Sequence, residues 1–425
     1  MLTETVTEEI TAYAQELGEN AREAARGLRA LPLAKRNAAL KILAVSLVKA
    51  QASILEENAK DIEEGKARGL SAAMLDRLLL TPARIKGIAD NVKVIAALPD
   101  PVGRVIDKRK HKNGLRISRV SVPIGTILFI FESRPNVTID GGALCLKSGN
   151  AVILRGGKEA ARTNAVFARL FEEALQAKGI DPRAVQLVRN SDHALVDHLL
   201  ADARHIDLVI PRGGERLIQS VVEKARMPVI KHYKGVCHVY IDKTADMQAA
   251  GRIVVNAKAQ RPGVCNAMET LLLDKKLPAK GIKRILDGLL EHNVELRGDS
   301  AVRAIHPSVK AAVDADWDEE YLDLILSVRM VDGVAGAVEH INLHGTNHTD
   351  AVVAESPKVQ KAFVDGIDSA STMINASTRF ADGSEYGLGA EVGISTDKLH
   401  ARGPMGLESL TTYRWIVEGK GHVRA

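Results

Sequence analysis

The stretch Thr126-Ile127-Leu128-Phe129-Ile130-Phe131, followed by the polar turn Glu132-Ser133-Arg134-Pro135-Asn136, sets the fold class. The residues after Thr126 are all apolar and mostly β-branched or aromatic, which is typical of a buried strand in a parallel sheet. Residues 137–147 then have the composition of a helix. We therefore expect a strand, a turn at its carboxyl end and a helix, which is the repeating unit of an open α/β fold.

The same unit repeats in two sets, one from 124 to 242 and one from 243 to 380. The expected strands are Thr126–Phe131, Ala151–Leu154, Ala184–Val188, Ile206–Ile210, His238–Ile241, Leu271–Leu273, Val294–Leu296, Ala351–Val353 and Thr372–Ile374. The expected helices are 137–147, 159–178, 193–203, 214–225, 247–258, 281–292 and 357–369. Strand–helix alternation of this kind predicts mostly parallel, doubly wound sheets.

Other patterns precede and follow these sets. Residues 4–98 have helical periodicity. Residues 103–122 form a predicted hairpin around Asn113-Gly114, a turn in which both residues take positive φ. The basic run Lys108–Lys112 on one arm is either a solvated edge or an anion-binding site. Leu410–Val417 is predicted to be a terminal strand.

Composition and charge exclude several classes of protein. The chain has 425 residues, of which 46% are hydrophobic and 26% charged, as in a globular protein of two or three domains. Its net charge of +5 is too small and dispersed to indicate nucleic-acid binding. No apolar run reaches the roughly 18–20 residues of a membrane span, and the acidic N-terminus does not resemble a secretory signal. Three widely spaced cysteines indicate neither disulfides nor a metal site, so we expect a reducing, cytoplasmic setting.

Cys265 is the first candidate for chemistry, in the loop Gln260-Arg261-Pro262-Gly263-Val264-Cys265-Asn266. A cysteine that opens a helical turn gains from the helix dipole, which favours the thiolate. Backbone N–H groups at such a turn also stabilise an oxyanion. The alternative is a buried, inert thiol, which is the favoured interpretation for Cys145 and Cys237 within their apolar runs.

Two Gly-Gly turns, Gly156-Gly157 and Gly213-Gly214, each follow a strand and open a helix. Glycines there let a phosphate or a ribose approach the backbone N–H groups of a helix N-terminus. The fingerprint GxGxxG is absent, so a dinucleotide must bind by another scheme. Asn136, after the first strand, is a candidate amide donor to an oxyanion, with helix N-capping as the alternative.

Together these features resemble the aldehyde dehydrogenase superfamily. A closer resemblance, to the branch that reduces L-glutamyl 5-phosphate, extends over nearly the whole chain. The segments that carry it are Phe131–Asn136, Gln260–Ala267, Gly383–Glu391 and Arg402–Leu407. The resemblance implies an α/β fold with two doubly wound parallel-sheet domains and a small β oligomerisation flap. It also implies that Cys265 is the nucleophile and that Asn136 donates to the oxyanion.

The resemblance assigns cofactor-binding residues as well. Arg155 takes the position of a lysine that contacts the adenosine ribose, and Gly156-Gly157 and Gly213-Gly214 take the cofactor-loop positions. Glu320 resembles the glutamate that hydrogen-bonds the nicotinamide ribose, with a solvated helix-end acid as the alternative. Lys158 stands where NAD-binding relatives often have an acid, and its charge would attract the 2′-phosphate of NADPH.

The implied reaction is NADPH-dependent reduction of L-glutamyl 5-phosphate to L-glutamate 5-semialdehyde, through a Cys265 thioester and with release of phosphate, as in the second step of proline synthesis. His232 stands where aldehyde oxidisers carry the glutamate that activates water, which suits an acyl group exchanged with phosphate. Arg134 and Arg261 are expected to hold the substrate carboxylate or phosphate, with structural ion pairs as the alternative. The rival functions are an NAD-dependent aldehyde oxidiser and a non-catalytic scaffold with this fold.

The expected domain bounds are 1–102 and 123–241, joined by part of 384–404, for an NADPH-binding domain, and 242–383 for a catalytic domain. The hairpin 103–122 and the C-terminal segment 405–425 are expected to pair between subunits of a homo-oligomer, as in the superfamily. A small molecule is the expected substrate, and the resemblance makes glutamate 5-kinase a candidate partner.

Overall fold

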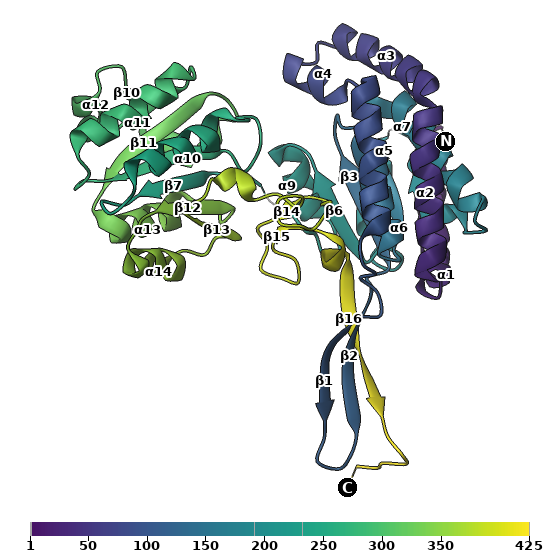
Figure 1. Ribbon diagram of the computed structural model, residues 1–425. Helices are drawn as coiled ribbons and strands as arrows, with labels where there is room; N and C mark the ends of the chain where they lie inside the picture. Colours follow the sequence, from purple (N-terminus) through teal and green to yellow (C-terminus); the bar gives the residue numbers. More distant parts are fainter. Residues whose placement is uncertain (1, 191, 232, 425) are drawn as a thin grey trace. The chain divides into compact units, whose positions relative to one another are not determined.

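The computed structural model describes residues 2–190, 192–231 and 233–424 (Figure 1). The chain divides into two compact units, which are described one at a time. Unit 1 comprises Met1–Lys231, Gly387–Gly393 and Met405–Ala425, and unit 2 comprises His232–Tyr386 and Ile394–Pro404.

Unit 1 is built on a parallel four-stranded sheet in the order β5-β4-β3-β6. Its strands are β3 (Thr126–Phe131), β4 (Ala151–Gly156), β5 (Val185–Leu187) and β6 (Leu208–Arg212). The alternating helices are α6 (Asn136–Lys147), α7 (Ala161–Gln176), α8 (His193–Ala201) and α9 (Glu215–Lys224), with 3-10 turns η1 (Lys158–Ala160) and η2 (Pro182–Ala184). Every residue of β3 is buried, which confirms the strand predicted from its apolar run.

Five helices precede this sheet, as the periodicity of residues 4–98 predicts. They are α1 (Leu2–Arg29), α2 (Leu33–Lys49), α3 (Gln51–Ala67), α4 (Ala72–Leu78) and α5 (Pro82–Ala97). Leu40, Leu43 and Leu47 form the buried stripe of α2. Within the described residues, no single helix is long and apolar enough to cross a membrane; α2 and α3 pass that test only as a pair, bent by 70° at their junction.

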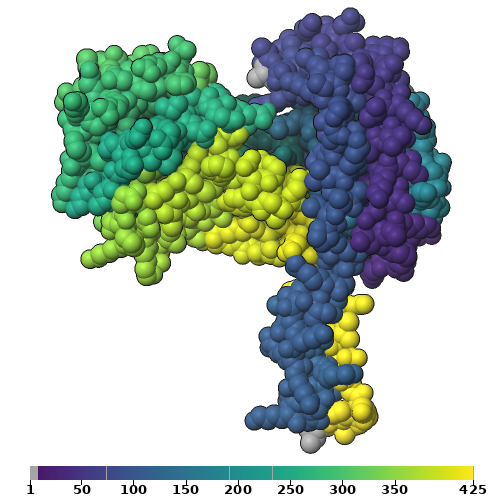
Figure 2. All heavy atoms as spheres, in the orientation of Figure 1, coloured from purple at the N-terminus to yellow at the C-terminus, as the bar shows by residue number. Residues whose placement is uncertain are grey.

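A separate three-stranded antiparallel sheet has the order β1-β2-β16. Its strands are β1 (Val105–Lys110), β2 (Arg116–Pro123) and β16 (Thr411–Glu418), which follows the 3-10 turn η5 (Leu407–Leu410). The blue atoms of the hairpin and the yellow atoms of β16 run side by side in Figure 2. The predicted terminal strand is confirmed, and within the chain it pairs with β2 of the hairpin. In the part of the chain that the structure describes, β1 and β16 are the edge strands of this sheet.

The hairpin is confirmed, whereas its predicted two-residue turn is wrong. The connection runs from His111 to Leu115, and the N–H of His111 donates to the carbonyl of Leu115 at 2.9 Å. Only Gly114 takes a positive φ, 97°, after a turn closed by its own N–H on the His111 carbonyl at 2.9 Å. The longer loop places the positive φ at glycine alone, so Asn113 escapes the strain of that conformation.

Unit 2 is built on a parallel seven-stranded sheet in the order β10-β9-β11-β8-β7-β12-β13. Its strands are β7 (Cys237–Ile241), β8 (Met268–Asp274), β9 (Glu295–Gly298), β10 (Lys310–Ala311), β11 (Ile325–Val331), β12 (Thr349–Val353) and β13 (Ser371–Ile374). Its helices are α10 (Met247–Ala259), α11 (Ala279–Glu291), α12 (Ser300–Ile305), α13 (Gly333–His344) and α14 (Pro357–Gly366). The smaller elements are η3 (Asp314–Asp318), η4 (Thr378–Phe380), β14 (Ile394–Ser395) and β15 (Gly403–Pro404).

One prediction about this second set is wrong, and some of its elements were not predicted. The predicted boundary at 241/242 is wrong, because β7 pairs with β8 and β12 and therefore belongs to the second sheet. Strand β11 and helix α13 were not predicted. In β11 the polar residues Ser327 and Arg329 interrupt the apolar run on which the prediction of strands relied. The division into two doubly wound parallel sheets is confirmed.

Candidate functional site

Unit 1 gathers its predicted site residues at the carboxyl edge of the four-stranded sheet. Strand β3 lies between β4 and β6. The strand order reverses at β3, because β4 and β5 lie on one side of it and β6 lies on the other. Ligands of open α/β sheets bind at such a switch point. The turn after β3 and Gly213-Gly214 after β6 border it, and Gly156-Gly157 lies at the end of β4. Backbone N–H groups at the start of helices, as in these turns, fit the phosphate groups of a cofactor.

Each Gly-Gly turn is contacted by a carboxylate. The N–H of Gly214 donates to Glu132 Oε2 at 2.8 Å. A Cβ at Gly157 would overlap the carboxylate of Glu159, which accepts hydrogen bonds from the Ser133 N–H at 2.5 Å and hydroxyl at 2.8 Å. Glu132 directly follows the predicted strand Thr126–Phe131, and Glu159 begins the predicted helix 159–178, so their positions in the sequence could have indicated both acids.

Two basic residues border the first glycine turn. Arg155 is partly buried, and its Nη1 donates to the Gly156 carbonyl at 3.3 Å. Burial lowers the pKa of Arg155, while the carboxylates of Glu159 and Glu132 favour its charged form. Lys158 is exposed. The ammonium group of Lys158 is therefore more accessible to solvent and solutes than the guanidinium of Arg155.

Asn136 is the first residue of α6, and the helix-capping position is taken by Pro135. N-capping is therefore the wrong interpretation of Asn136. Its Nδ2 donates to Asp140 Oδ2 at 2.9 Å, one helical turn along. Burial raises the pKa of Asp140, and the hydrogen bonds from Asn136 and Asn91 oppose that shift. The amide is thus held by one of its two N–H groups, which leaves the second for another acceptor. Arg134 is partly buried in the turn just before.

Unit 2 gathers its predicted site residues at the amino edge of its sheet. All neighbouring strands run parallel, so the segments that precede them meet at one edge. Gly235 precedes β7, Cys265 precedes β8, and Glu320 precedes β11. The carboxyl-edge rule that locates the turns of unit 1 therefore does not locate this site.

Cys265 is partly exposed, whereas Cys145 and Cys237 are buried. Burial raises the pKa of both buried thiols, which makes them poor nucleophiles. The expectation that Cys265 opens a helical turn is wrong: the turn around it closes with the Ala267 N–H on the Val264 carbonyl at 3.0 Å, and β8 follows. No helix begins at Cys265, so the helix N-terminus expected beside this thiol is not found there.

The segment that leads into β7 supports Cys265 from its backbone side. A Cβ at Gly235 would overlap the Cys265 carbonyl oxygen and lie 2.8 Å from the carbonyl carbon. Cys237 Sγ–H donates to the same carbonyl oxygen at 3.2 Å. The N–H of Gly235 donates to Glu320 Oε1 at 2.9 Å. Gly235 thus joins the cysteine turn to the acid predicted to hold the nicotinamide ribose.

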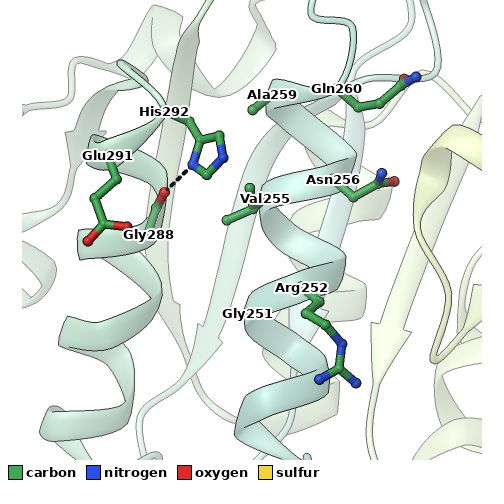
Figure 3. A pocket seen from close by; sticks show the side chains of 9 residues that line it. All are labelled: Gly251, Arg252, Val255, Asn256, Ala259, Gln260, Gly288, Glu291 and His292. Carbon is green, nitrogen blue, oxygen red and sulfur yellow. Dashed lines mark hydrogen bonds between the residues drawn. The ribbon is translucent and has the colours of Figure 1, made fainter.

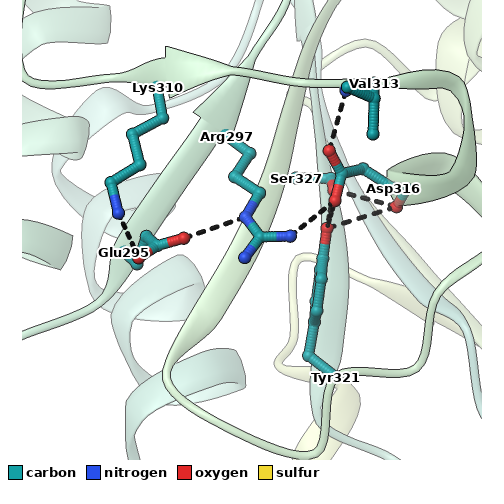
Figure 4. Close-up of polar contacts among 7 residues, drawn as sticks. All are labelled: Glu295, Arg297, Lys310, Val313, Asp316, Tyr321 and Ser327. Carbon is teal, nitrogen blue, oxygen red and sulfur yellow. Dashed lines mark hydrogen bonds and ion pairs between the residues drawn. The ribbon is translucent and has the colours of Figure 1, made fainter.

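Glu320 lies in the irregular segment between η3 and β11 and is partly buried. Its carboxylate is thus not fully solvated, and it accepts the Gly235 N–H. Its neighbour Tyr321 anchors this segment, because the phenol donates to Asp316 Oδ1 at 2.7 Å and meets Ser327 Oγ at 2.8 Å (Figure 4). Burial favours protonation of Asp316, but hydrogen bonds, including one from Arg297 at 2.8 Å, outweigh it and lower the pKa.

A buried ion pair lies beside the same segment and was not predicted. Lys258 Nζ contacts Glu269 Oε2 at 2.5 Å, and both side chains are fully buried. Burial raises the pKa of Glu269 to about 7, although Lys258 opposes the shift. Glu269 also accepts the N–H of Leu322 at 3.3 Å. The pair therefore links α10 and β8 to the segment that carries Glu320.

Two further residues named in the sequence analysis are Arg261, four residues before Cys265, and His232. Arg261 is exposed and forms no ion pair within the described part of the chain, so the structural ion pair proposed as its alternative is not found. His232 lies outside the described residues.

A groove of about 550 Å³ separates α10 from α11 (Figure 3). Its lining residues are Gly251, Arg252, Val255, Asn256, Ala259, Gln260, Gly288, Glu291 and His292. Neither Cys265 nor Glu320 is among them, so this groove is not the candidate site.

Known proteins resemble the chain over most or all of its length. The family model "Aldehyde dehydrogenase family" matches residues 3–303. A gamma-glutamyl phosphate reductase of Geobacter metallireducens is 49% identical over 99% of this chain and 100% of the relative, and one of Paramagnetospirillum magneticum is 47% identical over 98% of each. The crystal structure of gamma-glutamyl phosphate reductase from Thermotoga maritima superposes with a TM-score of 0.95 at 42% identity, over 97% of this chain and 100% of that one.

Proposed function

Because this chain belongs to the aldehyde dehydrogenase family, and within it to the gamma-glutamyl phosphate reductases, we propose that it reduces L-glutamyl 5-phosphate to L-glutamate 5-semialdehyde and releases phosphate. It is an oxidoreductase of proline biosynthesis. The observation that carries the proposal is the contrast among its thiols. Cys265 is partly exposed at the amino edge of the seven-stranded sheet, where Glu320 also lies, whereas Cys145 and Cys237 are buried.

In the proposed reaction, Cys265 Sγ attacks the acyl carbon and a sulfur–carbon bond forms. The bond from that carbon to the phosphate oxygen breaks, its electron pair leaves with phosphate, and a thioester remains on Cys265. The amide of Asn136 and the backbone N–H of Cys265 are assigned to the oxyanion, where one such donor is worth roughly 10²–10³ in rate. The nicotinamide cofactor of the family supplies the hydride when it is bound.

The cofactor residues are proposed on the arrangement around β3. Arg155, Gly156-Gly157 and Gly213-Gly214 would hold the adenosine ribose and the pyrophosphate, and Glu320 the nicotinamide ribose. NADPH is proposed over NADH because exposed Lys158 carries a positive charge where relatives that bind NAD often carry an acid. The nearest acid, Glu159, is engaged by Ser133.

Lys158→Glu tests this preference. Each opposite-charge contact near water is worth about 1 kcal/mol, and reversing the charge should weaken NADPH binding about 10- to 100-fold with little change for NADH. Both dissociation constants can be measured by fluorescence titration. Lys41→Glu, an exposed charge reversal on α2, serves as the matched control. Equal losses for NADPH and NADH in Lys158→Glu would remove the argument for NADPH.

The rival function is an aldehyde oxidiser that uses water and NAD. The two differ in the reverse direction, where the proposed enzyme needs phosphate to accept the acyl group. We expect oxidation of glutamate 5-semialdehyde with NADP to continue only when phosphate is present. Steady turnover at an undiminished rate without phosphate would favour the oxidiser.

We propose a homo-oligomer formed through the three-stranded sheet, in keeping with the family. Among the described residues its edge strands β1 and β16 each pair with a strand, β2, on one side only, and edges of this kind pair with a second chain. Strand β16 also exposes Tyr413 and Trp415, each 49% exposed. Glutamate 5-kinase, which would supply the acyl phosphate, stays a candidate partner.

A further inference from the structure

Arg379 is a partly buried cation whose side chain is held by neutral groups. It lies in η4, just after β13. Its Nε donates to Gln260 Oε1 at 2.8 Å, and its Nη1 donates to Asn266 Oδ1. Within the part of the chain that the structure describes, Arg379 forms no ion pair. Its charge is therefore oriented by amides without being neutralised by a carboxylate.

The two amides fix Arg379 to the turn that carries the nucleophile. Gln260 begins the turn and Asn266 directly follows Cys265. Asn266 is only 4% exposed, and its Nδ2 donates to the Ala381 carbonyl at 2.9 Å. The buried Asn266 side chain thus contacts both the guanidinium of Arg379 and the backbone two residues after it. The guanidinium is therefore anchored to the turn that carries Cys265.

The charged groups around Arg379 include a second cation, Arg261. Burial lowers the pKa of Arg379, and neighbouring Arg261 lowers it further, while Asp382 and the Cys265 thiolate favour the charged form. Two guanidinium groups that repel each other beside a nucleophile cost free energy when nothing lies between them. A planar fork of N–H donors matches the paired oxygens of a phosphate or a carboxylate. An oxyanion bound by Arg379 would offset the cost.

We propose that Arg379 binds the phosphoryl group of the acyl phosphate, an inference that rests on the proposed function and deepens it. Arg379 stays protonated and donates its N–H groups to phosphoryl oxygens while the sulfur–carbon bond forms and the carbon–oxygen bond breaks. In reverse, it holds inorganic phosphate while a phosphate oxygen attacks the thioester carbon and the Cys265 thiolate leaves.

The substrate has a second oxyanion, its α-carboxylate, and the structure favours the phosphoryl group. The phosphate is attached to the very carbon that Cys265 attacks, whereas the α-carboxylate lies at the far end of the carbon chain. A cation held by the residue next to Cys265 is placed for the nearer group.

The test compares Arg379→Gln and Arg379→Lys with Arg252→Gln, an exposed arginine about two helical turns from Gln260 on α10 (Figure 3). In the reverse reaction we expect Arg379→Gln to raise the KM for phosphate about 10- to 100-fold. The KM values for semialdehyde and NADP should stay within about twofold. The KM for phosphate of Arg379→Lys should lie between those of the wild type and Arg379→Gln, since lysine keeps the charge but lacks the planar set of N–H donors. Arg252→Gln should have the wild-type KM for phosphate.

A second readout does not depend on the substrate. Iodoacetate is anionic and iodoacetamide neutral, so the ratio of their alkylation rates at Cys265 should fall in Arg379→Gln and stay unchanged in Arg252→Gln.

The outcomes separate the two proposals. An unchanged phosphate KM, or a rise confined to semialdehyde, overturns the assignment of Arg379 while the proposed function stands. A wild-type enzyme that needs no phosphate overturns the proposed function instead. If Arg379→Gln does not fold, as judged by cofactor titration, Arg379→Lys decides: a raised phosphate KM supports the assignment and an unchanged one refutes it.

Discussion

Replacing Cys265 with alanine is expected to lower turnover by at least roughly 10⁴-fold, as removal of a covalent nucleophile does in other enzymes. The cofactor should bind nearly as tightly as before, because its proposed contacts come from the glycine turns, Arg155, Lys158 and Glu320. Cofactor oxidation with acyl phosphate and fluorescence titration of NADPH measure the two quantities.

Cys145→Ala provides the control for this variant. Cys145 is fully buried in α6, so its truncation should cost stability and leave turnover per folded molecule nearly unchanged. If Cys265→Ala kept a tenth of the wild-type rate, the covalent route would be wrong.

Gly235→Ala is expected to lower kcat/KM roughly 10²-fold, because a misplacement of ~1 Å in a catalytic group costs about that much. The new Cβ would overlap the Cys265 carbonyl oxygen, and its other neighbours are the Cys265 carbonyl carbon at 2.8 Å and Cα at 2.9 Å. These are backbone atoms and cannot rotate away as a side chain would. The cysteine turn must shift, and the Gly235 N–H must shift relative to Glu320.

Gly251→Ala is the matched control, since a Cβ there meets no atom within 4 Å and helix α10 tolerates alanine. In Gly235→Ala, both the steady-state kinetic constants and the rate of Cys265 alkylation should change. In Gly251→Ala, both should stay at their wild-type values. Wild-type kinetics in Gly235→Ala would show that the position of the cysteine turn is not set by this glycine.

The apolar runs were sufficient to predict most strands, because a strand buried on both faces has few polar residues. They were not sufficient for β11, in which Ser327 is buried but hydrogen-bonded to Tyr321. Nor does alternation say which sheet a strand joins: β7 follows the first set in sequence but pairs with β8 and β12. Pairing between distant segments leaves no local signal in the chain.

The site divides in the same way. Turns that follow apolar strands, such as those at Asn136 and Gly213-Gly214, are readable from local sequence. Lys258 and Glu269 are charged residues that sequence alone places on a surface, and only the fold shows them paired in the interior. Arg379 lies far along the chain from Cys265, and three-dimensional contact with Gln260 and Asn266 is what connects them.

The most direct measurement of the central claim is intact-protein mass spectrometry of the wild-type chain after incubation with glutamate 5-semialdehyde and NADP in the absence of phosphate. We predict one glutamyl group per chain, located on the peptide that contains Cys265 and removed when phosphate is added. Turnover without any adduct, or an adduct on another residue, would contradict the thioester mechanism.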